Sequence, residues 1–226
     1  MGIDPETGRR VFFGSRGEKV YYDHSQPTAR RWLLDNDMPF QGSLDRVICG
    51  NSLPTYFGGW SNSLNYKNID LNIFFQFSGG NNIFNGMKST ASDMRFWNNT
   101  KDVLTQAWAP DNKNNATFAR PVFMDNVSNG SAYSISDFME KGDYLRLKNV
   151  SLGYTFKTRG WFANSEFGIS SLRIFAQAQN LFVLTKYTGL DPETISNVGT
   201  PILAGGVDKN TLPQARSYTF GLNISF

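Results

Sequence analysis

Few residues of this sequence could carry out catalysis. The single histidine, His24, follows Asp23, and a carboxylate beside an imidazole could orient a general base. The alternative, which we favour, is a polar loop residue. The chain contains neither a Gly-x-Ser-x-Gly nucleophile elbow nor a His-Glu-x-x-His metal motif, and the glycine pairs at 58–59, 79–80 and 205–206 lack phosphate-loop spacing. The sequence therefore predicts a protein that is not an enzyme and that carries no cofactor.

Metal and redox chemistry have equally little support. Cys49 is the only cysteine, so an internal disulfide cannot form, and no cluster of cysteines and histidines predicts a zinc site. The acidic stretch Asp35-Asn36-Asp37-Met38-Pro39 lacks the glycine expected in a calcium-binding loop. This stretch therefore does not predict a calcium site.

Side chains that could hold a ligand or a partner protein lie in two long connections. The aromatic candidates in the first are Trp97, Trp108, Tyr133 and Phe138. They could stack on sugar rings or grip a peptide, or they could pack the helices of their own loop. In the second connection, Asp191 and Glu193 could accept hydrogen bonds from a substrate or a partner. The alternative for these two carboxylates is turn chemistry around Gly189 and Pro192.

The composition restricts the class of protein. Charged residues make up 18% of the 226 residues, below the roughly 25% of soluble domains, whereas aromatic residues reach 15%. No uninterrupted apolar run approaches the roughly 18 residues that a membrane-spanning helix requires. Lys and Arg (22) exceed Asp and Glu (19) by a net charge of +3, and no segment concentrates this excess into a basic stripe. Nucleic acid is therefore not an expected partner.

The elements that must position these residues are predicted by period-two alternation, which marks strands with one apolar and one polar face. Two alternating runs, 56–66 and 69–77, are joined by Lys67-Asn68 and predict a hairpin. Further alternating runs cover 144–156, 172–178 and 217–226. Residues 90–97 and 101–108 have modest helical character, and residues 10–13 and 19–22 predict a second hairpin. We predict an all-β fold of antiparallel strands whose long connections carry short helices.

Alternation alone does not distinguish a soluble sandwich from a membrane barrel, because both have strands with two different faces. The connections favour the barrel. The turn from Tyr66 to Ile69 is tight, whereas the connections from Phe77 to Tyr144 and from Leu184 to Ser217 are long. Short periplasmic turns, longer extracellular loops and aromatic residues at the strand ends are typical of outer-membrane barrels.

Three segments and the last strand resemble the C-terminal part of SusC/RagA-type TonB-dependent outer-membrane transporters of Bacteroidetes. The three segments are Gly50-Asn51-Ser52-Leu53-Pro54-Thr55-Tyr56-Phe57-Gly58-Gly59, the run from Gly142 to Tyr154, and the run from Gln179 to Glu193 that contains Tyr187-Thr188-Gly189-Leu190-Asp191-Pro192-Glu193. The last strand resembles the one that closes the barrel in this family. Its residues Tyr218, Phe220, Leu222 and Phe226 resemble the terminal signal that the barrel-assembly machinery reads. The resemblance spans roughly residues 40–226.

The resemblance implies the C-terminal part of a 22-stranded transmembrane β-barrel in the cell outer membrane, in contact with its lipid. It further implies an N-terminal plug domain, energy supplied through TonB, and a SusD-like surface lipoprotein that helps to capture an oligosaccharide or peptide substrate. Five polar residues would face the lumen of this barrel: Asp70, Asn72, Gln76, Gln177 and Gln179.

Under this resemblance the chain is expected to be a C-terminal fragment without the plug, the TonB-binding segment or most of the barrel. Residues 1–54 would form an extracellular loop with a partial strand hairpin. Residues 55–226 would supply barrel strands at about 55–78, 144–156, 172–184 and 215–226, with loops at 79–143 and 185–214. The alternative class is a soluble all-β carbohydrate-binding module.

Overall fold

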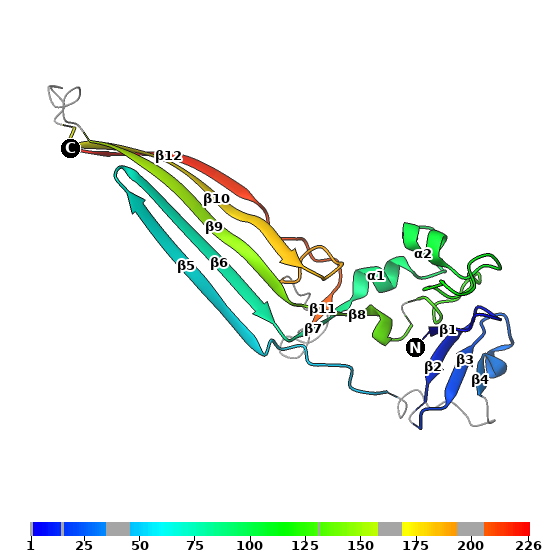
Figure 1. Ribbon diagram of the computed structural model, residues 1–226. Coiled ribbons are helices and arrows are strands. Elements are labelled where there is room, and N and C mark those ends of the chain that lie inside the picture. Colours follow the sequence, from blue (N-terminus) through cyan, green and yellow to red (C-terminus); the bar gives the residue numbers. More distant parts are fainter. Residues whose placement is uncertain (1, 15, 35–45, 131, 158–168, 194–205) are drawn as a thin grey trace. The chain divides into compact units, whose positions relative to one another are not determined.

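The computed structural model describes residues 2–14, 16–34, 46–130, 132–157, 169–193 and 206–226. The chain divides into two compact units (Figure 1). One unit comprises residues 1–52, 82–140 and 195–211, and the other comprises residues 53–81, 141–194 and 212–226. Each unit is thus assembled from three separate stretches of sequence. We call the first the loop unit and the second the sheet unit.

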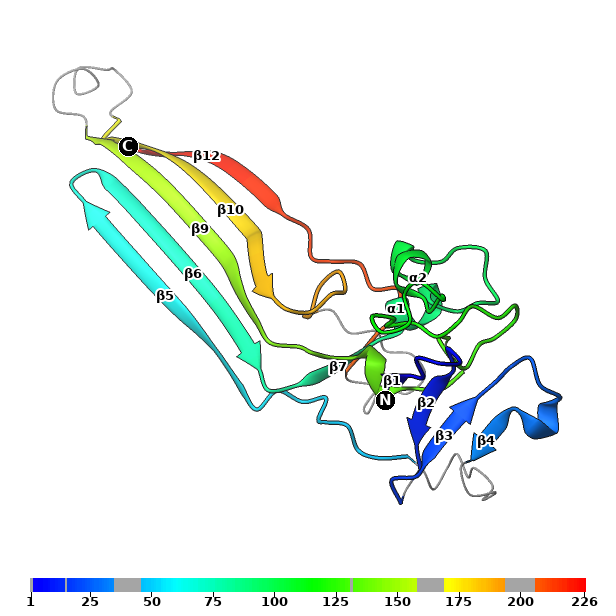
Figure 2. The same cartoon turned by 45° about the vertical axis from the view of Figure 1, so that its right-hand side comes forward.

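The sheet unit contains one five-stranded antiparallel sheet in the order β12-β10-β9-β6-β5, seen from two directions in Figures 1 and 2. Its strands are β5 (Tyr56–Tyr66), β6 (Ile69–Gly79), β9 (Tyr144–Lys157), β10 (Ser171–Thr185) and β12 (Ser217–Ser225). Apolar and aromatic residues occupy alternate positions of these strands, which suits a pleated strand with two unlike faces. Within the described residues, β5 pairs only with β6 and β12 only with β10, so the sheet has two unpaired edges.

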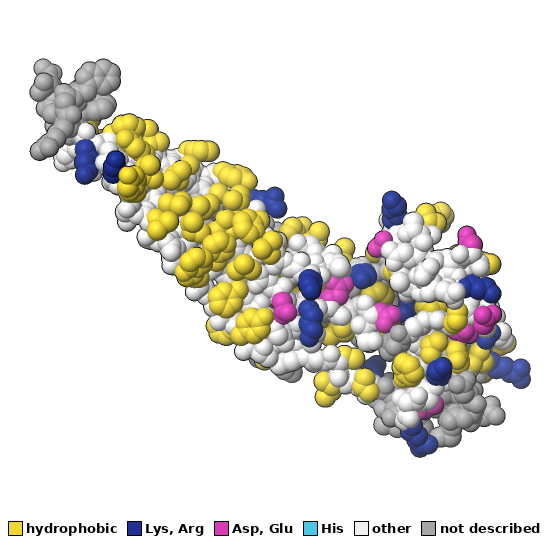
Figure 3. Space-filling model, in the orientation of Figure 1, with side chains coloured by type: hydrophobic (Ala, Val, Ile, Leu, Met, Phe, Trp, Pro, Cys, Tyr) yellow, Lys and Arg dark blue, Asp and Glu magenta, His cyan; other side chains and the backbone are white. Residues whose placement is uncertain are grey.

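The register gathers the apolar residues of all five strands on one face, because directly paired residues point to the same side of a sheet. Two neighbouring rows read, from β5 to β12, Tyr66, Ile69, Tyr154, Ile174, Leu222 and Leu64, Leu71, Leu152, Ala176, Phe220. Most of these side chains are exposed, Phe220 to 81%. Figure 3 shows hydrophobic side chains covering this side of the sheet. We call it the apolar face.

Register shifts in β9 and β10 keep this face continuous. On β9 the register with β6 skips Lys148, so Val150 and Leu147 both lie on the apolar face although they are three residues apart. On β10 the register with β9 shifts between Gln179 and Phe182, where Asn180 adopts a φ of 52°. Phe182 lies on the same face as Ala178, four residues before it, and pairs with Leu147.

The loop unit has a buried core of its own. Its four-stranded antiparallel sheet has the order β1 (Gly2–Ile3), β2 (Arg10–Phe13), β3 (Lys19–Tyr22) and β4 (Trp32–Leu34). The core consists of Phe12, Val20, Tyr22, Val127, Ile135 and Phe138, with Trp32 and Phe84 packed against it. Residues far apart in the sequence thus bury one another, as in an ordinary globular domain.

Short elements complete the loop unit. They are β7 (Asn82–Asn85), β8 (Met139–Lys141) and β11 (Val207–Asp208), which form a second sheet, the helices α1 (Gly86–Ala91) and α2 (Lys101–Gln106), and the 3-10 turns η1 (Thr28–Arg30) and η2 (Ser136–Phe138). Of these elements, only Lys141, the last residue of β8, is counted in the sheet unit. Helix α1 lies earlier than the helical segment expected over 90–97, because Asn85 caps it by accepting a hydrogen bond from the Lys88 amide. None of the helices in the described ranges is long and apolar enough to cross a membrane.

Candidate functional site on the polar face of the sheet

The face of the sheet opposite the apolar face carries polar side chains. All five residues predicted to face inward lie on it: Asp70, Asn72, Gln76, Gln177 and Gln179. The register shows this directly, because Asn72 pairs with Ser151 and Ser151 pairs with Gln177 across three neighbouring strands. The sheet therefore has the two unlike faces that the sequence pattern indicates. That the polar face lines a lumen stays a prediction.

An ion pair crosses the polar face between β6 and β10. The Arg173 guanidinium contacts the Asp70 carboxylate through Nη2 at 2.5 Å and Nε at 2.9 Å. The strand between them, β9, has Gly153 at this point, and a Cβ there would collide with both Arg173 Nη2 and the Asp70 carboxylate. Gly153 thus leaves room for the ion pair to pass over the middle strand.

Shorter polar side chains on this face bond to one another. Ser63 donates to Asn72 at 2.7 Å, and Gln177 donates to Asn149 at 2.9 Å. These pairs join neighbouring strands and satisfy polar groups that point away from the apolar face.

A buried ion pair anchors the connection that follows β10. Arg146 of β9 and Asp191 are 3% and 2% exposed, and Arg146 Nη2 lies 2.5 Å from Asp191 Oδ1. The Asp191 carboxylate also accepts hydrogen bonds from the backbone amides of Glu193 and Gln214, both at 3.0 Å. One carboxylate therefore joins β9, the connection after β10 and the segment that leads into β12.

Glu193 extends this network toward β6. Its Oε1 accepts hydrogen bonds from Gln76 Nε2 at 3.2 Å and from Lys148 Nζ at 3.4 Å. Its Oε2 lies 3.0 Å from Arg146 Nε, an ionic contact without hydrogen-bond geometry. Lys148 is skipped where the β6–β9 register shifts, and it also donates to Gln214 at 2.7 Å. We call Arg146, Lys148, Asp191 and Glu193 the charged anchor.

The segment held by the charged anchor packs closely. Tyr187 is buried, and a Cβ at Gly189 would collide with the Tyr187 ring. Burial of a paired carboxylate is costly unless its hydrogen bonds are satisfied, and Asp191 meets that condition with three donors. The contacts of Asp191 and Glu193 are thus made inside the sheet unit. Their role in contacting a ligand or partner stays a prediction.

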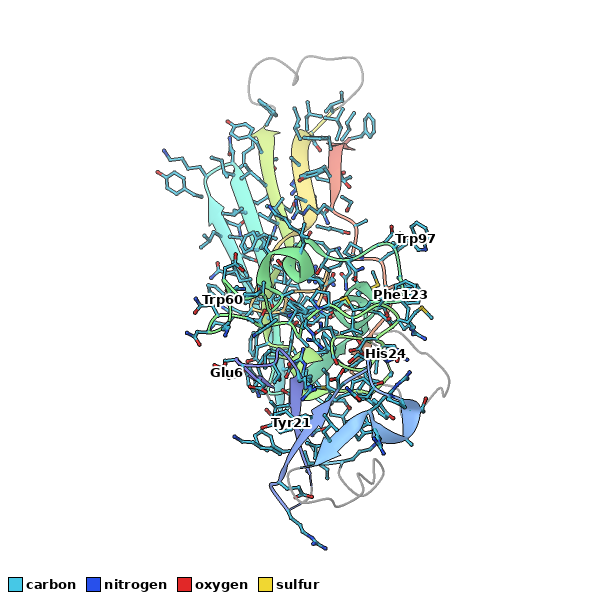
Figure 4. All side chains as sticks on the ribbon, turned by 90° about the vertical axis from the view of Figure 1, so that its right-hand side faces the viewer. Glu6, Tyr21, His24, Trp60, Trp97 and Phe123 are labelled. Carbon is cyan, nitrogen blue, oxygen red and sulfur yellow. The ribbon has the colours of Figure 1, made fainter. Side chains whose placement is uncertain are left out.

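The aromatic candidates of the first long connection differ in exposure. Trp97 is fully exposed, and Figure 4 shows it pointing away from the chain around it. Trp108 donates from Nε1 to the Pro5 carbonyl at 2.8 Å. Tyr133 meets Trp32 edge to face, with ring centroids 5.9 Å apart. The part of the chain that the structure describes contains no ring contact among Trp97, Trp108 and Tyr133, so their use in ligand binding stays a prediction.

His24 and Asp23 do not form a general-base pair. His24 Nδ1 lies 3.0 Å from the Tyr22 hydroxyl, whereas the Asp23 carboxylate binds Arg9 and Ser25. Cys49 has an exposed free thiol. Among the described residues there is no group of three His, Cys, Asp or Glu side chains suited to a metal ion, and the stretch 35–39 lies outside them.

The proposed terminal signal lies on and just after β12. Tyr218, Phe220 and Leu222 alternate along the apolar face, and Phe226 directly follows the strand. All four side chains are exposed. Their recognition by the barrel-assembly machinery stays a prediction.

Three residues of the site were not predicted from the sequence: Arg146, Lys148 and Arg173. Each is a cation inside a long strand, and Arg146 and Arg173 occupy positions that alternate with apolar residues. A buried or half-buried cation at such a position requires an anionic partner, and this is the signal that could have found them. The identity of the partners could not have been read from the sequence, because Asp191 lies 45 positions from Arg146.

Known proteins of similar sequence align with most of the chain. No family model matches the sequence. TonB-dependent receptor P3 of Formosa agariphila is 34% identical over 189 residues, which is 80% of this chain and 17% of the receptor. TonB-dependent receptor SusC of Bacteroides thetaiotaomicron is 26% identical over 209 residues, which is 92% of this chain and 19% of the receptor. The chain thus spans less than a fifth of the length of these two relatives.

Solved structures give the same result. The RagAB peptide importer in its closed-closed state matches with a TM-score of 0.70 and 26% identity, over 100% of this chain and 22% of that chain. The importer in its open-open state matches with a TM-score of 0.67 and 25% identity, over 96% of this chain and 22% of that chain. The chain is therefore homologous to one segment of the SusC/RagA-type TonB-dependent receptors, which are transporters and not enzymes.

Proposed function

We propose that this chain forms part of the wall and of the extracellular loops of a TonB-dependent transporter in the outer membrane. The observation that carries the proposal is the five-strand-wide apolar face, which stays exposed while the other side of the same sheet is polar. Large contiguous apolar surfaces are rare on soluble monomers. Strands that alternate apolar-out and polar-in are the pattern of a transmembrane barrel.

The edges of the sheet support the same proposal. Strands β5 and β12 each present one edge without a partner in the described residues. Unpaired backbone groups are costly in lipid, and single-chain bacterial barrels contain at least about eight strands. A five-stranded sheet in a membrane therefore requires further strands on both sides. In this proposal residues 55–226 supply strands of the wall, whereas residues 1–54 and the connections 79–143 and 185–214 lie outside the cell.

The polar face would then line the lumen. Asp70, Gln76 and Gln177 would face the substrate path, and the charged anchor would hold the connection after β10 against the inner side of the wall. Asp191 and Glu193 would position this loop through Arg146. Substrate contact in the loops would fall to exposed side chains such as Trp97.

The relatives support a proposal for the substrate and the partners. The matched structures are of a peptide importer, and the family resemblance implies glycans or peptides captured with a SusD-like lipoprotein. We propose that the receptor containing this segment imports an oligosaccharide or a peptide with such a lipoprotein and draws its energy from TonB. The barrel-assembly machinery would insert it, with Phe226 and the β12 aromatics as its signal.

Cell fractionation tests the location. An epitope placed after Asn114, an exposed position of the loop unit, at the chromosomal gene would mark the protein in the cells that make it. We expect the epitope in the outer-membrane fraction, resistant to carbonate extraction, and accessible to antibody on intact cells. Recovery in the soluble fraction would instead support the soluble carbohydrate-binding module, in which Leu222 and Ile224 would pack against a second sheet.

Uptake assays test the substrate class. Deletion of the gene should abolish uptake of either a labelled peptide mixture or a labelled oligosaccharide mixture while leaving the other unchanged. Unchanged uptake of both classes would contradict the proposed transport function even if the protein proved to be in the outer membrane.

A further inference from the structure

One end of the apolar face contains a pocket of about 570 Å³, to which the proposed function above assigns no role. It lies where β5 begins, where β6 ends, just before and at the start of β9, and at the end of β10. The lining residues that matter here are Tyr56, Phe77, Leu184, Lys141, Lys186 and Asp143. All of them belong to the sheet unit.

The apolar part of this pocket continues the apolar face. Phe77 pairs with Leu145, and Leu145 pairs with Leu184, so these three residues form an apolar row across β6, β9 and β10. Tyr56 and Leu184 are exposed. A hydrocarbon chain lying on the apolar face would therefore meet continuous apolar side chains up to this pocket.

The polar part of the pocket carries an excess of positive charge. Lys141 and Lys186 are both exposed, and neither forms a salt bridge with any residue in the described ranges. Asp143 also lines the pocket, and its Oδ1 accepts a hydrogen bond from the Gly80 amide at 2.7 Å. The pocket lining thus contains two ammonium groups, of Lys141 and Lys186, and one carboxylate, of Asp143, which already accepts a backbone hydrogen bond.

We propose that this pocket binds a phosphate-bearing glycolipid of the outer leaflet. Its acyl chain would lie along Phe77 and Leu184, and its phosphate would pair with Lys141 and Lys186. The inference rests on the proposed function, because in the barrel this end of the sheet, from which both long connections leave, lies at the outer surface of the membrane. Lysines at the edge of an apolar band reach with their charged ends to the headgroup level, where they meet phosphate.

The opposite end of the same sheet offers a matched control. There the tight turn contains Lys67, whose Nζ lies 5.2 Å from the centre of the Tyr66 ring. Lys67 has the same charge and also lies at the border of the apolar face, but no residue of the pocket is near it in the sheet register.

Lipid binding to the purified receptor tests the inference. The receptor would be taken from cells that carry each variant at the chromosomal gene and inserted into phosphatidylcholine nanodiscs, alone or with lipid A or phosphatidylglycerol. Native mass spectrometry would measure the bound lipid. We expect saturable binding of lipid A, weakened roughly fivefold by K141A and by K186A, since one lysine near a membrane surface contributes about this factor. K67A should leave lipid A binding unchanged, and K186R should retain it.

The outcomes separate the two proposals. Lipid A binding that none of the lysine variants changes would overturn the glycolipid site while leaving the barrel intact. Equal weakening of lipid A and phosphatidylglycerol binding would show a site for any anionic lipid and would also overturn the assignment. A wild-type receptor that fails to insert into the nanodiscs would instead contradict the proposed barrel itself.

Discussion

The two units of this chain use the same kinds of apolar residue in opposite ways. In the loop unit, Phe138 is 2% exposed and Val20 is fully buried, whereas in the sheet unit Phe220 is 81% exposed. The loop unit is thus stabilised by apolar side chains that leave water on folding. The sheet unit obtains less of this stabilisation from its own described residues, because it buries only a few apolar side chains, such as Leu147 and Tyr187, beside the Arg146–Asp191 pair. Most of its other apolar side chains are exposed, and the proposed function places them in lipid.

Both units nevertheless fix their connections with one buried arginine. In the loop unit, Arg10 donates from Nε to the Ser128 carbonyl at 2.7 Å and from Nη2 to Asn129 at 3.0 Å, and it pairs with Asp137. Burial lowers the pKa of Arg10, and Asp137 acts against this shift. Arg146 has the same role in the sheet unit. The units therefore differ in where apolar residues point and agree in how distant segments are tied together.

The largest effect is expected from breaking the charged anchor. Arg146→Ala leaves the Asp191 carboxylate buried without its cation, which we expect to lower the free energy of unfolding by about 3–5 kcal/mol. Urea midpoints of the receptor in detergent would measure this. The paired change Arg146→Met with Asp191→Leu removes both charges and should restore part of the loss.

The partly exposed Arg173–Asp70 ion pair of the same sheet is the control for this change. Arg173 and Asp70 are each about a quarter exposed, so Arg173→Ala should cost only about 0–1 kcal/mol. Equal costs for Arg146→Ala and Arg173→Ala would mean that burial does not distinguish the two pairs.

A pair of phenylalanine truncations tests the opposite use of apolar residues. Phe138→Ala should leave a cavity in the loop unit and cost about 3–5 kcal/mol. Phe220→Ala should cost less, about 1.5–3 kcal/mol, because lipid fills the space and only the transfer of the ring is lost. Amide hydrogen exchange in each unit of the receptor would resolve the two effects. A larger cost at Phe220 would show that it packs in a protein core.

Neighbouring residues on β6 test the two faces of the sheet. Ile73→Arg puts a charge on the apolar face and should cost about 2–4 kcal/mol near the middle of a bilayer, whereas Asn72→Arg on the polar face should be much milder. The amount of folded receptor in the outer membrane would report both. Equal losses would show that the two faces are wrongly assigned.

The positions of the sheet unit's strands, and the side of the sheet to which their residues point, could be predicted from the sequence. A period of two over nine or more residues is a strong signal for a strand with two unlike faces. The sequence also placed Asp70, Asn72 and Gln177 on one side. It was insufficient where stability depends on contacts between distant segments. The bulge at Asn180 appeared in the sequence only as a break in phase, and the pairing of Arg146 with Asp191 left no local pattern.

The loop unit was harder to predict for the same reason. Residues 10–13 and 19–22 show a hairpin pattern, but the core that covers them includes Val127, Ile135 and Phe138. No short pattern indicates that these segments meet, because loop closure of this length depends on tertiary packing and not on local preference. The short strands β7, β8 and β11 pair across similar separations.

The smallest expected effect is a loss of stability at acidic pH, and it is confined to the loop unit. Burial raises the pKa of Asp23, but hydrogen bonds from Ser25 and Arg9 outweigh it and hold this pKa below its usual value of 3.8. Asp23 therefore stabilises the loop unit above its unfolded pKa, and this contribution is lost as the pH falls toward the folded pKa. Asp23→Asn should lower amide protection in β2 and β3 at pH 6 and reduce the further loss on going to pH 3. Asp111→Asn, at an exposed position, should behave like the wild type, and amides of β9 in the sheet unit should not respond to either change. If wild type and Asp23→Asn lost equal protection between pH 6 and pH 3, the contacts of the Asp23 carboxylate with Ser25 and Arg9 would not stabilise the loop unit.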